Sequence, residues 1–393
     1  MKNKWEEVTL GELMTFKNGL NFSQDLNGME YNFLGVGSFK SKNAIRDVSE
    51  LEKIYLSNSF DTEYLLKKND LVFVRSNGSK ELVGRCVLIE NEIKNTTYSG
   101  FCIKGSLKSE KTTSKYILKI IEAGFLKERL KHENRGTNIS NLNQEILNSL
   151  EIKLPSIEEQ NKIIEILSTW DSAIEKTEKL ISEKEKMFNG ISQKIFRKTG
   201  IKHKISEFLT IRNEKCIPND STPLYSLTIE DGVTQKSDRY NREALVKDSE
   251  EKEYKVVYPG DIVFNPANLR WGAIARSNET KKVAVSPIYE VLQLDSSKIN
   301  SDYLTFLLTS KDKIRYYATK TEGTLVERMA VKVDVFLNFQ IEIEEDCETQ
   351  KKSAEVLLAL KKEIALLKKQ LEQYKLQKQG LMQKLLTGEW RVK

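Results

Sequence analysis

Two short stretches carry residue types that could serve methyl transfer to an adenine in DNA. Adenine methylation uses an Asn-Pro-Pro-aromatic loop that holds the target amino group, and NPAN, from Asn265 to Asn268, supplies its first two positions. FLGVG, from Phe33 to Gly37, satisfies the Phe-x-Gly-x-Gly pattern of a loop that binds S-adenosylmethionine, and it precedes NPAN in the usual order. Together they raise the hypothesis of a stand-alone N6-adenine DNA methyltransferase.

The remaining positions of both stretches argue against that chemistry. Ala267 and Asn268 stand where the second proline and the stacking aromatic ring are needed, and Trp271 comes three residues too late. The residues after Gly37 lack the apolar period of a helix, although a nucleotide-binding glycine loop should open one. We therefore expect a binding role for the NPAN loop and keep the methyltransferase as the alternative.

Other catalytic or metal sites receive little support. Asp70 with Glu92 and Lys94 could form a nuclease-like acidic cluster, but such an arrangement is expected by chance in a chain with 31% charged residues. No Gly-x4-Gly-Lys-Ser/Thr phosphate loop is present, and neither His132 nor His203 has a motif partner. Zinc is not expected, because the cysteines are far apart in sequence, at Cys86, Cys102, Cys216 and Cys347.

Composition predicts a globular, cytoplasmic protein that can meet nucleic acid. The 393 residues are 39% hydrophobic, enough for two or three domains, and the net charge is +6. The N-terminal MKNKWEEVTL is polar and no uninterrupted apolar run approaches the length of a bilayer span, so we expect neither export nor membrane insertion.

The segments that would position any site occur twice. A shift of 190 residues superimposes NGISQKIF (from Asn189) on QGLMQKLL (from Gln379), and it also relates Gln160 to Gln350. Nearly the same shift relates LGELMTFKN (from Leu10) to ISEFLTIRN (from Ile205), NDLVFV (from Asn69) to GDIVFN (from Gly260), SKYI (from Ser114) to SDYL (from Ser301), and Gly136-Thr137 to Gly323-Thr324. The order is globular unit, helix, globular unit, helix.

The repeat also tests the methyltransferase hypothesis. FLGVG aligns with LYSLT, from Leu224 to Thr228, which has no glycine, so catalysis would be split between non-equivalent halves.

The two long helical segments carry matching heptad patterns with one polar interruption at Lys378. We expect the two apolar seams to pair as an antiparallel coiled coil on the order of 50 Å long; the alternative is that each packs on its own globular unit. The predicted interface residues are Leu167, Trp170, Ile174, Ile181, Phe188, Ile191, Leu357, Leu360, Ile364, Leu367, Leu371, Tyr374 and Leu381.

The predicted fold class is α+β, with two similar domains separated by the helix pair and related by an internal pseudo-two-fold repeat. Short β-branched and aromatic runs separated by Gly, Asn and Asp indicate a small twisted sheet in each globular unit. The predicted boundaries are 1–153 for the first recognition domain, 154–199 for the first helical region, 200–344 for the second domain and 345–393 for the second helical region.

Loops rich in Arg, Lys, Asn and Ser lie between the strands of both units. Arg and Lys read guanine edges or neutralise phosphate, and Asn pairs with adenine, so the loops suit major-groove readout of double-stranded DNA. Any single loop could be an ordinary solvated turn; because the loops differ while the framework repeats, we expect a bipartite, asymmetric target. The candidate DNA contacts are Lys40, Lys42, Asn43, Arg75, Asn77, Ser79, Lys80, Arg135, Thr137, Asn138, Arg239, Arg242, Asn268, Arg270, Lys320, Thr324 and Arg328.

The whole chain resembles the specificity subunits of type I restriction-modification enzymes. The residues that carry this resemblance are the two helical regions, LPSIEEQNKIIEIL onward from Leu154 and ETQKKSAEVLLAL onward from Glu348, and the stretch GDIVFNPANLRWGA from Gly260. The second region departs from the pattern, because EIEEDCETQ replaces the proline-led turn of KLPSIEEQ, which puts the start of that helix in question.

The resemblance implies a non-catalytic chain in which one domain binds each half of a split DNA site. It implies that the helices set the spacing and dock two methyltransferase subunits, to which restriction subunits are added. S-adenosylmethionine, ATP and Mg²⁺ would then belong to those partners, and no cofactor is expected in this chain. A coiled-coil scaffold that ignores DNA sequence is a further alternative.

Overall fold

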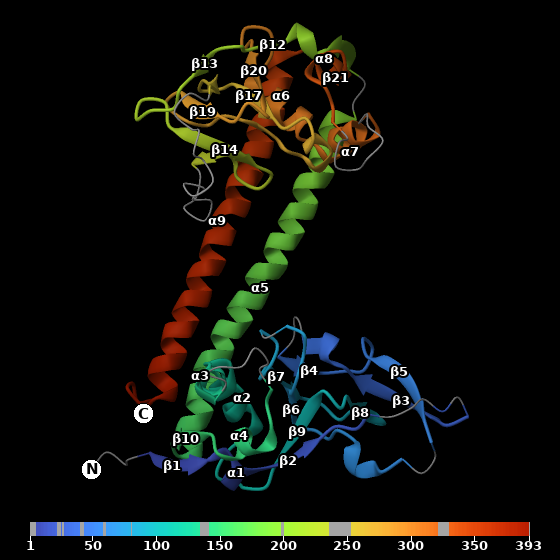
Figure 1. Ribbon diagram of the computed structural model, residues 1–393, viewed down its shortest axis with the longest axis vertical. Helices are drawn as coiled ribbons and strands as arrows, with labels where there is room; N and C mark the ends of the chain where they lie inside the picture. Colours follow the sequence, from blue (N-terminus) through green and yellow to red (C-terminus); the bar gives the residue numbers. More distant parts are fainter. Residues whose placement is uncertain are drawn as a thin grey trace. The chain divides into compact units, whose positions relative to one another are not determined.

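The computed structural model describes residues 5–21, 25, 27–39, 43–57, 60–79, 81–133, 141–197, 200–235, 253–320 and 330–392 (Figure 1). The chain forms two compact units: unit 1 comprises Met1–Lys176 and Leu371–Lys393, and unit 2 comprises Thr177–Gln370. Two long helices, α5 (Ile157–Phe196) and α9 (Cys347–Leu386), contribute part of their length to each unit.

Unit 1 contains a five-stranded sheet in the order β2-β9-β6-β7-β4, a three-stranded sheet β5-β3-β8 and the pair β1-β10. Most neighbours are antiparallel, but β3 with β8 and β4 with β7 are parallel. The strands are β1 (Glu6–Thr9), β2 (Met14–Asn18), β3 (Met29–Leu34), β4 (Ala44–Ile45), β5 (Glu52–Leu56), β6 (Leu71–Val74), β7 (Cys86–Ile89), β8 (Thr96–Tyr98), β9 (Cys102–Leu107) and β10 (Glu151–Leu154). The short helices are α1 (Leu10–Leu13), α2 (Ser114–Glu122), α3 (Phe125–Glu133) and α4 (Gln144–Asn148).

Unit 2 repeats this plan with sheets β12-β20-β17-β18 and β13-β16-β19-β14-β15 and the pair β11-β21. Its strands are β11 (Ile201–Lys204), β12 (Leu209–Ile211), β13 (Lys215–Cys216), β14 (Leu224–Thr228), β15 (Gly232–Gln235), β16 (Tyr254–Val257), β17 (Ile262–Phe264), β18 (Ile274–Arg276), β19 (Val283–Val285), β20 (Glu290–Leu294) and β21 (Gln340–Ile343). Its short helices are α6 (Ser301–Leu308), α7 (Lys311–Thr319) and α8 (Val333–Leu337).

The matching order of strands and helices in the two units confirms the predicted internal repeat. The order β2-β9-β6-β7 corresponds to β12-β20-β17-β18, and β14 has one antiparallel and one parallel neighbour, as β3 does. One local difference is that β16 precedes the central strand in unit 2, whereas unit 1 has the 3-10 helix η2 (Thr62–Tyr64) there.

The central strands β6 and β7 are apolar at every position because both faces of their sheet are covered. Leu71 and Phe73 point into the core that also contains α2, whereas Val72 and Val74 point into a second core on the opposite face. Figure 1 shows α2 beside β7, where the two elements contact each other. The double burial makes this sheet a rigid base for the loops at its ends.

The long helices pack antiparallel within each unit, as predicted. In unit 1, Ile163 and Leu167 of α5 share a core with Met382 and Leu385 near the end of α9, and in unit 2 Lys184 of α5 donates to Glu363 of α9 at 2.9 Å. All thirteen predicted interface residues are buried or half-buried. The same core in unit 1 includes residues of α2, so the helix ends also pack on the globular part and both predicted arrangements coexist.

The departure from the family pattern at the second helix does not weaken its start. Asp346 replaces the helix-capping Ser156 of the first helix, and its carboxylate accepts a hydrogen bond from Thr349 N at 3.0 Å. Gln350 is buried like Gln160, and its amide donates to Glu344 O at 2.6 Å while its oxygen accepts from Asn300 N at 2.9 Å. The glutamine in each helical region therefore fastens the helix start to the globular part.

The polar interruption at Lys378 belongs to a charged cluster in unit 1. Lys119 of α2 bonds Asp171 of α5 at 2.6 Å and Glu122 at 2.9 Å, and Lys378 also pairs with Asp171. At the equivalent places in unit 2, Phe306 and Phe188 stack edge to face with centroids 6.0 Å apart, and Lys361 Nζ lies 6.0 Å from the Phe306 ring. Ion pairs therefore join α2 to the long helices in unit 1, whereas aromatic contacts join the equivalent helix α6 to them in unit 2.

We expect Glu159→Gln to lower the free energy of unfolding by about 2 kcal/mol, because it removes the charged partner of a half-buried arginine. The Glu159 carboxylate accepts hydrogen bonds from Arg391 Nε at 2.7 Å, Arg391 Nη2 at 2.8 Å and Trp5 Nε1 at 3.1 Å. Chemical denaturation followed by circular dichroism measures the loss. Glu158→Gln, at the exposed neighbouring position, is the control and should change stability little; equal losses would contradict the assignment.

Candidate nucleic-acid interface

In each unit, two polar segments that are far apart in sequence are joined at the same place. Leu142 N donates to Arg75 O at 2.9 Å, which ties the segment before α4 to the loop that follows β6. The equivalent bond in unit 2 runs from Val331 N to Pro266 O at 3.0 Å and ties the segment before α8 to the loop that follows β17. The repeat thus builds one two-part surface on each unit.

A buried aspartate fixes the start of the central strand that carries each loop. Asp261 accepts from Tyr258 N at 2.8 Å within its own turn and from Arg212 Nε at 2.6 Å, and Gly260 has a φ of +87°. The hydrogen bond to Asp261 raises the pKa of the Arg212 guanidinium. In unit 1, Asp70 accepts from Lys67 N at 2.8 Å in the same turn, with Asn69 at a φ of +70°.

The NPAN loop is a closed structural turn and not a base-holding loop. The Asn265 side-chain oxygen accepts from Ala267 N at 3.0 Å, so the amide that would grip a base in a methyltransferase is used within the turn. The loop continues into the 3-10 helix η6 (Leu269–Trp271), and Gly272 follows at a φ of +93°. A Cβ at Gly272 would lie 3.0 Å from Ile314 of α7, which shows how closely the loop packs on that helix.

Because the loop packs on α7, three predicted DNA-contact residues of unit 2 lie on two elements that touch each other, η6 and α7. The Arg270 guanidinium lies 4.2 Å from the ring centre of Trp271, and the indole is 56% exposed. Asn268 is half-buried at the start of η6, and Lys320 is exposed at the end of α7, where its amine lies 5.6 Å from the Tyr316 ring. An exposed aromatic ring beside a guanidinium and an amide can contact base edges and phosphate together.

Unit 1 presents Asn77 and Ser79 as exposed side chains and Arg75 as half-buried, all on the loop after β6. Phe101, which the sequence analysis missed, is 55% exposed, and its carbonyl accepts from Arg75 N at 2.8 Å. An aromatic residue in the Ser-Gly-Phe turn before β9 was the available signal. Asn43 is exposed elsewhere, at the start of β4, where its carbonyl accepts from Leu88 N at 3.0 Å.

The other predicted contacts fall on parts of the chain outside the described residues. They are Lys40, Lys42, Lys80, Arg135, Thr137, Asn138, Arg239, Arg242, Thr324 and Arg328.

The glycine stretch does not form a cofactor loop in unit 1. Phe33 and Leu34 end β3, and the next element is the four-residue 3-10 helix η1 (Val36–Phe39), which is too short to present a helix N-terminus to a phosphate or carboxylate. Its counterpart β14 in unit 2 is an ordinary strand. These two observations, with the closed NPAN turn, remove the structural basis for the methyltransferase hypothesis.

The acidic residues considered for nuclease chemistry do not assemble. Asp70 is buried and accepts from Ser106 Oγ at 2.6 Å, and burial raises the pKa of its carboxyl. Glu92 is exposed, and within the described ranges no three His, Cys, Asp or Glu side chains gather as metal ligands. His203 bonds Glu207 at 2.8 Å in a local structural contact.

No helix among the described residues has the length and apolar character needed to cross a bilayer.

Comparisons with known proteins agree with this architecture. A family model described as the type I restriction modification DNA specificity domain matches residues 2–184. The type I restriction enzyme StySPI specificity subunit of Salmonella potsdam is 28% identical over 199 residues, which cover 49% of this chain and only 42% of that protein. The MjaVIII specificity subunit of Methanocaldococcus jannaschii is 25% identical over 99% of this chain and 93% of that protein.

The fold is also that of a solved structure. The type I restriction-modification S subunit from M. genitalium aligns with a TM-score of 0.58 and 15% identity over 98% of this chain and 97% of that chain. The matched specificity domain and the relative that spans nearly the whole chain show that this chain is similar to the DNA specificity subunits of type I restriction-modification systems.

Proposed function

We propose that this chain selects the DNA sequence for a type I restriction-modification complex, with each unit reading one half of a split, asymmetric site. The observation that carries the proposal is the pair of equivalent backbone bonds, Leu142 to Arg75 and Val331 to Pro266, which present different polar loops on one repeated framework. A framework that repeats while its loops differ suits recognition of two different short sequences. The chain itself contributes recognition and no catalytic step.

The proposal extends to the arrangement of the complex. Residues 1–153 and 200–344 act as the recognition domains, and the helical regions 154–199 and 345–393 act as the spacer that fixes the gap between half-sites. Two methyltransferase subunits dock on the chain, and restriction subunits join through the complex. S-adenosylmethionine, ATP and Mg²⁺ act in those partners, and the complex works in the cytoplasm.

Methylation mapping tests the proposed function directly. The chain is co-expressed with the methyltransferase subunit of the same system, and N6-methyladenine is mapped across the host genome by long-read sequencing. We expect one split motif with a fixed gap, and no methylation when either protein is expressed alone. An active partner that yields no motif, or methylation by this chain alone, would overturn the proposal.

A further inference from the structure

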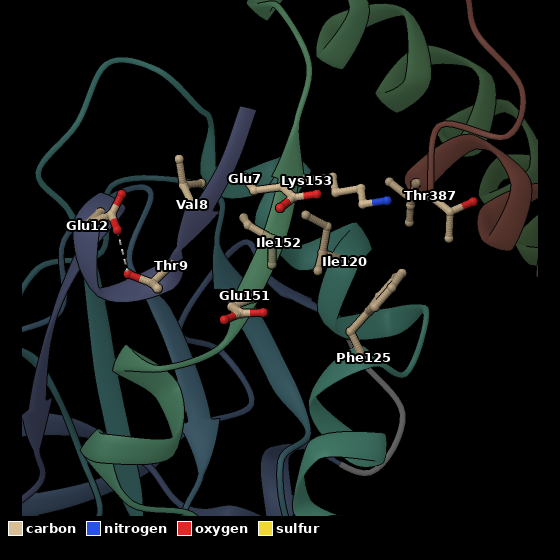
Figure 2. A pocket seen from close by; sticks show the side chains of 11 residues that line it. Glu7, Val8, Thr9, Glu12, Ile120, Phe125, Glu151, Ile152, Lys153 and Thr387 are labelled. Carbon is tan, nitrogen blue, oxygen red and sulfur yellow. Dashed lines mark hydrogen bonds between the residues drawn. The ribbon is translucent and has the colours of Figure 1, made fainter. Parts of the chain in front are cut away.

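A cavity of about 480 Å³ opens in unit 1 beside the β1-β10 strand pair (Figure 2). This volume is within the range of sites that bind ligands or anchor side chains, roughly 300–1,000 Å³. Its walls come from β1, α1, α2, α3, β10 and the end of α9 with the residue that follows, and Figure 2 shows the lining side chains. The lining residues are Glu7, Val8, Thr9, Glu12, Ile120, Phe125, Glu151, Ile152, Lys153, Leu386 and Thr387.

The cavity combines apolar walls with an excess of negative charge. Ile120, Ile152 and Leu386 are buried core residues, and Phe125 is half-buried. Three carboxylates and one lysine line the same space. Such a mixture suits an apolar anchor that is flanked by positive charge.

Two of the carboxylates have no partner within the part of the chain that the structure describes. Glu7 and Glu151 are exposed, and their carboxylates make no hydrogen bond or ion pair with any described residue, whereas the Glu12 carboxylate accepts from Thr9 Oγ1 at 3.1 Å. Glu7 faces Lys153 across the strand pair without forming an ion pair. These carboxylates are available to a basic partner.

The repeat gives the equivalent position in unit 2 the opposite charge. Lys202 of β11 occupies the place of Glu7 and faces Glu342 of β21, as Glu7 faces Lys153. Lys204 replaces Thr9, and the neutral Gln340 replaces Glu151. A basic segment attracted to unit 1 would therefore meet lysines at the matching place in unit 2.

We propose that the cavity of unit 1 is a docking site for a segment of the methyltransferase subunit in which an apolar side chain is flanked by Arg or Lys. This inference rests on the proposed function, because it takes the methyltransferase as a partner. The apolar side chain enters between Ile120, Phe125 and Ile152, and the basic residues pair with Glu7 and Glu151. Because unit 2 is inverted in charge, the two copies of the partner bind this chain with unequal affinity.

Charge reversal in the full-length chain tests the docking site. Binding of the purified methyltransferase subunit is measured by isothermal titration calorimetry at low and moderate salt. We expect Glu7→Lys with Glu151→Lys to weaken the tighter of two binding events about 10- to 100-fold and to reduce its salt dependence. Glu92→Lys, an exposed reversal on the same unit outside the cavity, is the matched control and should leave both events unchanged.

A second variant tests the apolar part and guards against loss of folding. Thr387→Trp places an indole at the rim, keeps the carboxylates and should weaken the same binding event about tenfold or more. Unchanged binding in a folded Thr387→Trp variant, or equal losses in Glu7→Lys/Glu151→Lys and Glu92→Lys, would overturn the docking site. A dimer of this chain lost on reversal would also overturn it, by making a second copy the occupant. If the wild-type chain does not bind the methyltransferase at all, the proposed function itself fails.

Discussion

Replacing Asn268 and Arg270 together with alanine should erase one half of the methylated DNA motif and leave the other half unchanged. Each good bidentate side-chain contact with a base edge discriminates by about 1–3 kcal/mol, so the loss of both should lower affinity for the site about 100- to 1,000-fold. Both residues lie at η6, where the close contact with α7 is made by Gly272. The two side-chain replacements should therefore not disturb the framework. Genome-wide methylation mapping and fluorescence anisotropy with the mapped duplex measure the two effects.

A control and a reciprocal variant make this prediction specific. Lys281→Ala removes an exposed positive charge from the loop between β18 and β19 of unit 2, away from the predicted contact loops, and should weaken binding only slightly and equally for all sequences. Asn77→Ala, at the equivalent position of unit 1, should relax the opposite half of the motif. If Asn77→Ala and the double variant both relaxed sequence specificity at the same half of the motif, the assignment of one unit to each half-site would be wrong.

Asp171→Ala should cost about 3 kcal/mol of unfolding free energy, the largest single-residue loss we expect on the helix pair. Asp171 bonds both Lys119 and Lys378, whose side chains are only 9% and 15% exposed. Without this carboxylate, two largely buried amines share Glu122 alone. Urea denaturation followed by circular dichroism measures the loss.

The Glu185–Lys368 pair provides the matched control for Asp171. It joins the same two helices at 2.7 Å, but its side chains are 46% and 58% exposed, so Glu185→Ala should cost between about 0 and 1 kcal/mol. Losses of equal size in the two variants would show that the cluster around Asp171 adds nothing beyond a surface ion pair.

The same cluster predicts a pH dependence. Burial raises the pKa of Asp171, but the charges of Lys119 and Lys378 outweigh it and hold the pKa below its ordinary value of 3.8. A carboxyl group with a lowered folded pKa stabilises the fold fully above the unfolded pKa and loses that contribution as pH falls through the folded pKa. The wild-type protein and Asp171→Ala should therefore differ fully at neutral pH and converge below pH 3.8.

The sequence predicts most of the framework because its signals are local and occur twice. The fully apolar run LVFV requires a strand covered on both faces, and the heptad spacing identifies the buried side of both long helices. Lys378 shows the limit of such signals. It breaks the heptad pattern, but its partners lie on α2 and α5, far away in sequence, so only the fold explains it.

The candidate site is less predictable than the framework. Loop composition singles out the segments after β6 and β17 as candidate contacts, but no short-range pattern shows that Arg75 O and Pro266 O accept equivalent bonds from Leu142 and Val331. Phe101 lies beside the loop that follows β6 because it directly precedes β9, and β9 pairs with β6. The methyltransferase hypothesis arose because a tight strand-turn-strand also favours Asn-Pro, which is a structural preference and not a catalytic one.

The different clusters that join α2 and α6 to the long helices constrain how such a chain can evolve by recombination. In unit 1, Lys119 and Glu122 of α2 form ion pairs with Asp171 and Lys378 of the long helices. In unit 2, Phe306 of α6 instead contacts Phe188 and Lys361 of the long helices. A first domain transplanted into the second position would set Lys119 beside Lys361 and would lose Asp171, so that only Glu122 of its own helix would remain as an acidic partner. We therefore expect crossovers that replace a domain in its own position to preserve these contacts, and crossovers that move it to the other position to need the matching helix residues as well.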